Sequence, residues 1–322
     1  MTFTRRTLLG AAMLAAACAG SALPAFAAKP LTISFSQVGA ESEWRTANSA
    51  SIKAAAKQSG VNLKFADAQQ QQQNQVKAIR SFIAQRVDVI AFSPVVETGW
   101  ETVLREAKNA KIPVILTDRS VKVSDPSLYV SFIGSDFVEE GRRAGRWLQD
   151  YAKKNPNKQL NIVELQGTTG AAPANDRKKG FAEVIAGNPK MKIIRSQTAD
   201  FTRAKGKEVM EAFLKSEGKN INVLYAHNDD MAIGAIQAIE EAGLKPGKDI
   251  VIVSVDGVRG AFEAMMQGKL NVTVECNPLL GPTLMQTAQA VAARQPVAKR
   301  ITVPEGVFPA EVAAKVFPTR KY

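Results

Sequence analysis

The sequence repeats one pattern, in which an apolar, strand-like segment ends in polar residues. The clearest copy is IPVILTDRS (112–120), where an apolar run is followed directly by Asp118 and Arg119. The same pattern recurs in VLYAHNDD (223–230) and VIVSVDG (251–257). A buried parallel strand of this kind delivers an Asp, Asn or Arg to its carboxyl end, which is the edge where open α/β sheets bind ligands. The pattern therefore predicts an α/β fold with a polar site at the strand ends.

Strand and helix patterns alternate along nearly the whole chain. In one helical segment Val76, Ile79 and Phe82 recur at helical spacing. Strands that alternate with helices of this length predict parallel sheets. The expected strands lie at 31–38, 61–68, 87–94, 112–119, 129–136, 160–167, 191–200, 221–229, 249–257 and 271–278. The expected helices lie at 44–59, 73–85, 99–110, 136–154, from about 175, 202–216, 229–242, up to about 268, and 281–294.

This number of strand–helix units is too large for one small domain with a single core. A chain of 322 residues is long enough for two domains. We expect two Rossmann-like lobes, each with a doubly wound parallel sheet, that meet near Gly134–Asp136 and are joined by a hinge of several crossings. The expected boundaries are a signal peptide at 1–27, a first lobe at 28–135 plus 277–303, and a second lobe at 136–276 plus 304–322.

The N-terminal segment has the features of an export signal. Arg5 and Arg6 precede an apolar stretch, and a small-x-small site ends at Ala27. The sequence TRRTLL also resembles a twin-arginine signal, although two arginines in an ordinary positive region are an equal alternative. Lipidation at Cys18 is the weaker alternative, because the preferred leucine three positions earlier is missing. Residues 1–27 are therefore predicted to direct export and to be cleaved after Ala27.

The composition of the chain limits its other functions. It is 45% hydrophobic, enough to form a core, and loss of residues 1–27 lowers the net charge from +12 to +10. A basic chain suggests nucleic acid as a partner, but lysines and arginines alternate with acids on the expected helices and no nucleic-acid-binding motif is present. We interpret the charge as solvated surface. Only Cys276 remains after cleavage, so no internal disulfide is expected.

Polar and flat aromatic residues gather at the expected strand ends and helix starts. Carboxylates accept two hydrogen bonds and guanidinium groups donate two in one plane, which suits adjacent hydroxyl groups. Aromatic faces can cover the C–H face of a sugar ring, so the set predicts a sugar-binding cleft. Its members are Gln37, Glu41, Trp44, Arg45, Asp67, Gln70, Asp118, Arg119, Gln166, Asn175, Arg177, Asp200, Phe201, Asn228, Asp229 and Asp256.

Several of these residues could instead serve the fold alone. Asp229 and Asp230 could cap the helix that follows them, and this is the preferred interpretation for Asp230. A structural role is also open for an ion pair of Asp118 and Arg119, a turn at Asp256–Gly257, a solvated Arg177, and a hinge or core position of Trp44. The functional hypothesis depends on the joint placement of the set.

The sequence gives little support to an enzyme. His227 is the only histidine and is expected to pack or to lie in a loop. The chain has no metal-ligand spacing of Cys and His, and GTTG (167–170) lacks the lysine of a phosphate-binding loop. We therefore expect no catalytic residues, no metal and no cofactor.

Several segments together resemble the periplasmic sugar-binding proteins of bacterial ABC transporters, in the ribose- and galactose-binding group. They include SFSQVGAESEWR (34–45), LTDRS (116–120), NDRKKGFAE (175–183) and YAHNDD (225–230). The resemblance covers nearly the whole mature chain and is strongest to the galactofuranose-binding members. It implies a monomer in the periplasm that closes two lobes over one monosaccharide, galactofuranose or a similar furanose or pentose.

The resemblance also implies site residues and partners. The ligand-binding residues would be Glu41, Trp44, Arg45, Gln70, Asp118, Arg119, Arg177, Phe201, Asn228 and Asp256. Cys276 stands where ribose-binding relatives have a glutamine that contacts the sugar. The closed form would be recognised by the permease subunits, with a sensor role at a chemoreceptor or kinase as the alternative. The related DNA-binding regulators have a helix-turn-helix where this chain has an export signal, so nucleic acid is not an expected partner.

Overall fold

Two sheets of mainly parallel strands form the framework of the described residues. The structure is a computed structural model that describes residues 30–322, so the expected signal peptide lies outside the described residues. By internal contacts the chain divides into Met1–Pro30 and a second unit, Leu31–Tyr322. Within that second unit the described strands form two six-stranded sheets, in the orders β11-β5-β4-β3-β1-β2 and β12-β10-β9-β8-β6-β7. The expected α/β fold with two parallel-sheet lobes is confirmed.

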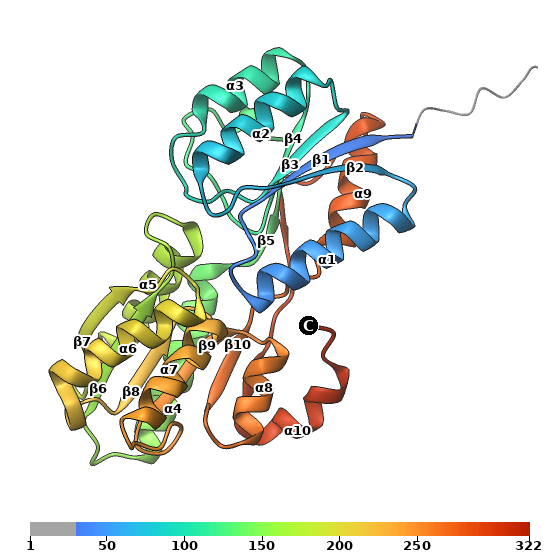
Figure 1. The fold of residues 1–322 in the computed structure, drawn as a ribbon. Coiled ribbons are helices and arrows are strands. Elements are labelled where there is room, and N and C mark those ends of the chain that lie inside the picture. The colour runs from blue at the N-terminus through green and yellow to red at the C-terminus, as the bar shows by residue number, and fades with distance from the viewer. Residues whose placement is uncertain (1–29) are drawn as a thin grey trace, which may run out of the picture. The chain divides into compact units, whose positions relative to one another are not determined.

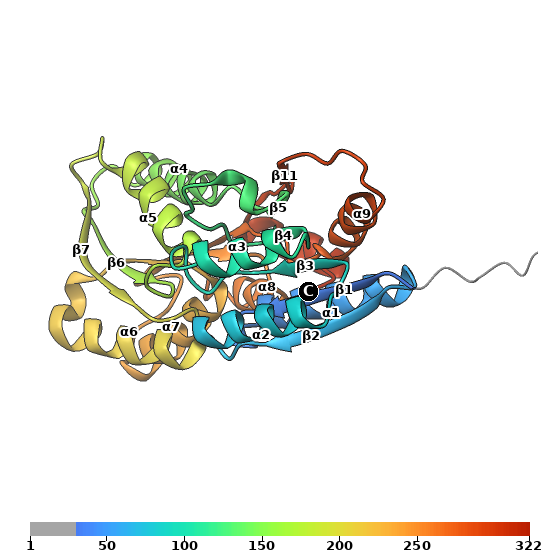
Figure 2. The same ribbon diagram turned by 90° about the horizontal axis from the view of Figure 1, so that it is seen from above.

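The first lobe is built around the first sheet. Helices α1 and α9 lie on one side of this sheet and α2 and α3 on the other (Figure 1). Figure 2 shows β11 beside β5, at the edge of the sheet. Its elements are β1 (Thr32–Gln37), α1 (Glu43–Gln58), β2 (Asn62–Asp67), α2 (Gln72–Ala84), β3 (Val89–Phe92), α3 (Glu101–Asn109), β4 (Val114–Thr117), the 3₁₀ helix η1 (Pro126–Leu128), β5 (Ser131–Gly134), α9 (Gly281–Ala292) and β11 (Arg300–Thr302).

The second lobe repeats the same winding around the second sheet. Helix α4 packs against α5, and α6 packs against α7. Its elements are α4 (Phe137–Lys154), β6 (Leu160–Gln166), α5 (Ala172–Ile185), β7 (Met191–Thr198), α6 (Arg203–Glu217), η2 (Gly218–Asn220), β8 (Val223–Ala226), α7 (Asp229–Glu241), β9 (Val251–Asp256), α8 (Arg259–Met266), β10 (Val272–Glu275), β12 (Val307–Pro309), η3 (Ala310–Val312), α10 (Ala313–Val316) and η4 (Phe317–Thr319).

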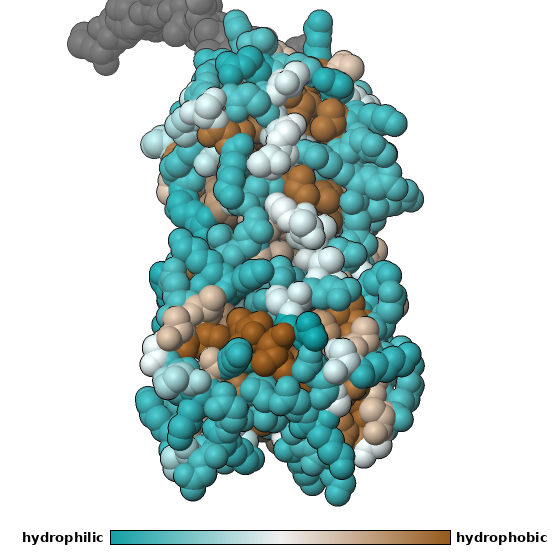
Figure 3. Space-filling model, turned by 90° about the vertical axis from the view of Figure 1, so that its left-hand side faces the viewer, coloured by the Kyte–Doolittle hydropathy of each residue, from teal (hydrophilic) through white to brown (hydrophobic). Residues whose placement is uncertain are grey.

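The apolar patterns explain why these segments form the core. Strands β1, β3, β4, β5, β8 and β9 are buried along their whole length, as expected for parallel strands that are covered on both faces. The face of the molecule in Figure 3 is mostly hydrophilic. Many surface charges are paired, for example Arg80 with Glu106 at 2.8 Å. Both observations agree with the interpretation of the basic charge as solvated surface.

Two expectations about secondary structure are corrected. Helix α5 begins at Ala172 rather than near Asn175, because Pro173 occupies its first turn, where a proline needs no N–H partner. The last long helix is followed by β11, β12 and α10, none of which is among the expected elements. β12 pairs antiparallel with β10, so the second sheet is not purely parallel. These elements are three and four residues long, too short to show a period.

Between Pro30 and Tyr322 the chain passes three times from one sheet to the other. The crossings are β5 to α4 (134–137), β10 to α9 (275–281) and β11 to β12 (302–307). Short crossings of this kind form a hinge, in which a few residues absorb the motion of the lobes. Every helix between residues 30 and 322 is too short or too polar to span a lipid bilayer.

The α4–α5 contact requires glycine at its centre. A Cβ atom at Gly180 would lie 2.0 Å from the carbonyl oxygen of Val138, and one at Gly141 would lie 2.2 Å from that of Arg177. The two backbones thus approach more closely than any side chain permits. This contact fixes the position of α5, and with it that of Arg177.

We predict that Gly180→Ala destabilises the protein by about 1–3 kcal/mol or more, because the added methyl group forces the two helices apart. Thermal unfolding of the variant measures the effect. Gly187→Ala is the matched control, since a Cβ there has no neighbour within 4 Å. Equal melting temperatures for the two variants would contradict the close-packing argument.

Candidate functional site

The start of α1 directs two side chains inward. Ser42 caps the helix, and its Oγ accepts a hydrogen bond from the backbone N–H of Arg45 at 3.1 Å. The cap fixes the first turn, so Trp44 and Arg45 are both buried. Trp44 Nε1 donates to the carbonyl oxygen of Cys276 at 2.6 Å. The start of α1 is therefore tied to the β10–α9 crossing.

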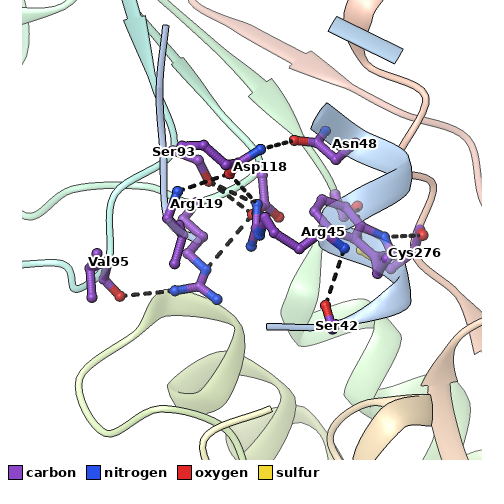
Figure 4. A network of polar contacts seen from close by, with 12 residues as sticks. Ser42, Arg45, Asn48, Ser93, Val95, Asp118, Arg119 and Cys276 are labelled. Carbon is purple, nitrogen blue, oxygen red and sulfur yellow. Dashed lines mark hydrogen bonds and ion pairs between the residues drawn. The ribbon is translucent and has the colours of Figure 1, made fainter. Parts of the chain in front are cut away.

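A buried ionic network joins α1 to the end of β4 (Figure 4). Arg45 Nη1 lies 2.8 Å from Asp118 Oδ2, and Arg45 Nε lies 3.2 Å from Glu41 Oε1. Burial alone would lower the pKa of Arg45, but Asp118 and Glu41 raise it above its usual value. Ser93 Oγ donates to Asp118 Oδ2 at 3.0 Å. Asp118 is therefore held on two sides.

Arg119 follows Asp118 and has fewer partners. Its Nη1 donates to the carbonyl oxygen of Val95 at 3.0 Å, and its guanidinium lies 5.3 Å from the ring of Phe201 in the second lobe. Burial and the nearby charge of Arg45 lower the pKa of Arg119 to about 10, so it remains protonated at neutral pH. The buried Nε of Arg119 and Oε2 of Glu41 have no hydrogen-bond partner within residues 30–322.

The second lobe contributes Arg177 from the first half of α5. Arg177 Nε donates to Glu140 Oε2 at 2.7 Å, and its Nη1 donates to the carbonyl oxygen of His227 at 2.5 Å. Its Nη2 lies 3.6 Å from Asp256 Oδ1. Burial alone would lower the pKa of Arg177, but Glu140 raises it above its usual value. Arg177 is therefore buried and paired, and the interpretation as a solvated side chain is wrong.

Asp229 holds the turn that carries Asp256. Its Oδ2 accepts hydrogen bonds from the backbone N–H groups of Gly257 at 2.7 Å and Val258 at 3.0 Å. Its Oδ1 accepts from the hydroxyl groups of Ser254 and Thr273. Asp256 has φ of 132°, a conformation that persists only where the surroundings enforce it. Burial raises the pKa of Asp256 well above its usual value.

The capping expectation for this segment is also corrected. Asn228 caps α7, since its Oδ1 accepts from the N–H of Met231 at 3.0 Å, while its Nδ2 donates to the carbonyl oxygen of Phe201 at 3.1 Å. Asp230 does not cap its own helix. Its Oδ2 accepts instead from the N–H of Glu43, at the start of α1 in the other lobe, at 2.8 Å. Sequence spacing could not show this contact because it joins residues 187 positions apart.

These groups surround one cavity between the two lobes. Its volume is about 20 Å³. The side chains of the two lobes therefore nearly fill the space between them, and a ligand would enter by separation of the lobes. The lining residues are Glu41, Ser42, Trp44, Arg45, Asp118, Arg119, Pro173, Arg177, Phe201, Asn228, Asp256 and Cys276.

The lining has equal numbers of acidic and basic side chains. Among the described residues it contains three arginines and three carboxylates, and Trp44, Pro173 and Phe201 add apolar surface. An anion or a cation would upset this balance, whereas a neutral ligand with many hydroxyl groups matches it. Glu41 Oε2 makes no hydrogen bond within residues 30–322, and neither does Arg119 Nε, which lies 3.7 Å from Asp118 Oδ2. Two lining residues thus retain an acceptor and a donor for such a ligand.

The structure brings most of the predicted ligand-binding residues together, but leaves Gln70 outside the lining. Gln70 lies in the turn after β2 with φ of 59°, and its backbone N–H donates to the carbonyl oxygen of Val38 at 2.7 Å. Its side chain lies against Gly39. Ser42 and Pro173 also line the cavity, although neither was predicted to do so. Ser42 lies just before the helix expected at 44–59, and Pro173 follows the GTTG turn by three residues.

Behind the cavity, Glu305 links the three crossings of the hinge. Its Oε1 accepts from the hydroxyl of Ser135 and from the backbone N–H of Asn277 at 3.2 Å. Burial and the nearby Glu140 raise the pKa of Glu305 to about 9. A protonated Glu305 can donate to Glu140, whose buried Oε1 otherwise lacks a partner among residues 30–322.

Glu140, Cys276 and Glu305 present ligand atoms within 4.8 Å of one another, a spacing that a metal ion could use. Arg177 already binds Glu140 at 2.7 Å, and burial raises the pKa of the Cys276 thiol well above its usual value. A cation here would meet a guanidinium group and a thiol that resists ionisation. A shared proton fits the cluster better than a metal.

Two α/β lobes, three crossings and a polar cavity between the lobes define a two-lobed binding protein. Residues 33–296 match the model of the periplasmic binding protein domain, and the chain belongs to that family. It is 56% identical over 280 residues to the galactofuranose-binding protein YtfQ of Escherichia coli, with 86% of each chain covered.

Two solved structures are similar over most of the chain. A structure from Mycobacterium smegmatis in complex with β-D-fucofuranose is 59% identical, with a TM-score of 0.89 over 91% of this chain and 95% of that one. The periplasmic binding protein of the arabinose ABC transporter from Shewanella sp. ANA-3, bound to α- and β-L-arabinofuranose, is 55% identical. Its TM-score is 0.86 over 90% of this chain and 95% of that one. The expected resemblance to sugar-binding proteins of ABC transporters is confirmed.

We predict that Glu305→Gln removes a pH-dependent loss of stability. The folded wild type keeps a proton on Glu305 up to about pH 9, whereas unfolding returns its pKa to the ordinary value of 4.5. Unfolding therefore releases this proton, and stability falls as the pH rises through that interval. A glutamine remains neutral and can make the same hydrogen bonds.

Urea unfolding from pH 5 to pH 9 tests this prediction. The variant should match the wild type at the acid end of the range and exceed it increasingly toward the alkaline end. Glu311→Gln, at an exposed position, is the control and should follow the wild type. A parallel pH dependence of wild type and Glu305→Gln would contradict a neutral Glu305.

Proposed function

We propose that the chain is the periplasmic substrate-binding component of an ABC sugar importer. Its ligand is a monosaccharide, galactofuranose or a similar furanose or pentose, held in the cavity between the lobes. The observation that carries the proposal is the cavity lining, in which balanced buried charges and two flat aromatic side chains leave a donor and an acceptor unpartnered. The relatives that bind galactofuranose, fucofuranose and arabinofuranose support the furanose class.

In the proposed mechanism the sugar first binds one open lobe. Closure then adds the contacts of the other lobe, so that Asp118 and Arg119 face Arg177, Asn228 and Asp256 across the sugar. Trp44 and Phe201 cover its apolar faces. The sugar stabilises the closed state only through the contacts that the open state lacks. The closed form is then recognised by the permease subunits, which take up the sugar.

The family also supports the remaining parts of the proposal. Relatives of this chain are binding proteins, which favours binding over catalysis. The 55% identical relative from Shewanella belongs to an arabinose ABC transporter, which favours an importer over a sensor. A monomer in the periplasm, exported by residues 1–27, fits that role. We propose lobe boundaries at 28–135 plus 277–303 and at 136–276 plus 304–322, since the crossings at 134–137, 275–281 and 302–307 support them.

Thermal melting of residues 28–322 with a panel of sugars tests the proposal. The panel contains galactofuranose-containing sugars, arabinose, ribose and galactose. At a ligand concentration about 100 times Kd, binding adds about 2.7 kcal/mol of stability, which raises Tm by about 4 °C in a chain of this size. We predict this shift with a furanose-forming sugar.

Arg119→Ala should abolish most of the shift, because charge-assisted hydrogen bonds contribute about 1.5–3 kcal/mol each. Arg105→Ala, which removes an exposed arginine paired with Glu101 on α3, is the control and should keep the full shift. Absence of a shift with every sugar in the panel would refute the monosaccharide proposal.

A further inference from the structure

Outside the cavity lining, two sets of polar contacts join the lobes. We call them the Glu43 clasp, made by Glu43, Arg203, Asp230 and Gly260, and the Glu97 clasp, made by Glu97, Gly170 and Asn175. None of these residues lines the cavity. Each set joins the first lobe to the second, so its cross-lobe bonds form only when the lobes are closed.

In the Glu43 clasp, a carboxylate of each lobe accepts a hydrogen bond from a helix N-terminus of the other lobe. Asp230 accepts from the N–H of Glu43, the first residue of α1, at 2.8 Å. Glu43 in turn accepts from the N–H of Gly260, in the first turn of α8, at 3.4 Å. A negative charge is stabilised at a helix N-terminus by the helix dipole and the free N–H groups. Each lobe thus supplies one helix N-terminus and one carboxylate, and each carboxylate accepts a hydrogen bond from the helix N-terminus of the opposite lobe.

Arg203 reinforces this clasp. Its Nε lies 2.6 Å from Asp230 Oδ1, and its Nη2 lies 3.0 Å from Glu43 Oε2. Arg203 therefore neutralises two carboxylates that burial and their mutual repulsion would otherwise disfavour. Burial and the charge of Asp230 raise the pKa of Glu43 above its usual value, which agrees with this crowding.

The Glu97 clasp lies in the loop after β3. The backbone N–H of Glu97 donates to the carbonyl oxygen of Gly170 at 3.0 Å, and Glu97 Oε2 accepts from Asn175 Nδ2 at 2.6 Å. The side chain of Glu97 is buried and also pairs with Lys122 of its own lobe at 2.9 Å. The GTTG turn of the second lobe therefore accepts a hydrogen bond from the first lobe when the lobes are closed.

We infer that the Glu43 and Glu97 clasps set the free energy of lobe closure and thereby scale the affinity for every sugar by one common factor. This inference rests on the proposed function. A bond that forms on closure but never touches the ligand adds to the stability of the closed state whatever sugar is bound. The apparent affinity follows the population of the binding-competent state. Cavity residues choose the sugar, and the clasps determine how tightly any accepted sugar is held.

The test compares Glu43→Ala, Asn175→Ala and their double variant by calorimetric titration with two sugars that the wild type binds. Each single change should weaken both sugars by the same factor, about two- to fivefold, since each removes a partly exposed polar contact. The double variant should weaken both by the product of the two factors, and dissociation should become faster. The ratio of the two Kd values should stay constant.

Arg80→Ala is the matched control, because Arg80 pairs with Glu106 inside one lobe at 2.8 Å. Its affinities should equal those of the wild type. Wild-type Kd values in the double variant, or a changed ratio between the two sugars, would overturn the inference while the proposed function stands. A wild type that binds no sugar would refute the proposed function, and the inference with it.

Discussion

The structure depends on the mutual neutralisation of charges that are buried between the lobes. Removal of a charged group from water costs several kcal/mol, which only a close partner of opposite sign offsets. Arg45 with Asp118 in one lobe, and Arg177 with Glu140 in the other, supply such partners. The remaining groups are only partly satisfied, as the Nε of Arg119 and the Oε2 of Glu41 show. A ligand with hydroxyl groups can supply the hydrogen bonds that these two groups do not make within the protein.

The hinge is built from the same chemistry as the cavity. Glu140 holds Arg177 from behind, and Glu305 lies beside Glu140 while it joins Ser135 and Asn277 of the other crossings. The position of Arg177 is therefore linked to the segments that move when the lobes open. On the cavity side, Trp44 binds the backbone of the β10–α9 crossing. Trp44 and Arg177 therefore belong to the cavity lining and also contact residues of the hinge, so ligand binding and hinge motion are coupled.

Local sequence patterns predicted most of the fold, because the spacing of apolar residues and the polar residues at strand ends can be read from short stretches of sequence. They also located Asp118, Arg177 and Asp256 at the cavity. They failed where long-range geometry decides, as for Asp230, which binds the start of α1 rather than its own helix. Gln70 stands beside a strand end but turns toward Gly39. Short elements such as β12 carried no periodic signal, so only the structure shows them.

The central claim is that one furanose is held by charged groups of both lobes. A crystal structure of residues 28–322 with a furanose that raises its melting temperature tests this claim most directly. The account predicts one sugar ring in the cavity, with hydroxyl groups bound to Asp118 and Arg119 on one side and to Arg177 and Asp256 on the other. A sugar bound outside the cavity, or by one lobe alone in the closed state, would contradict it.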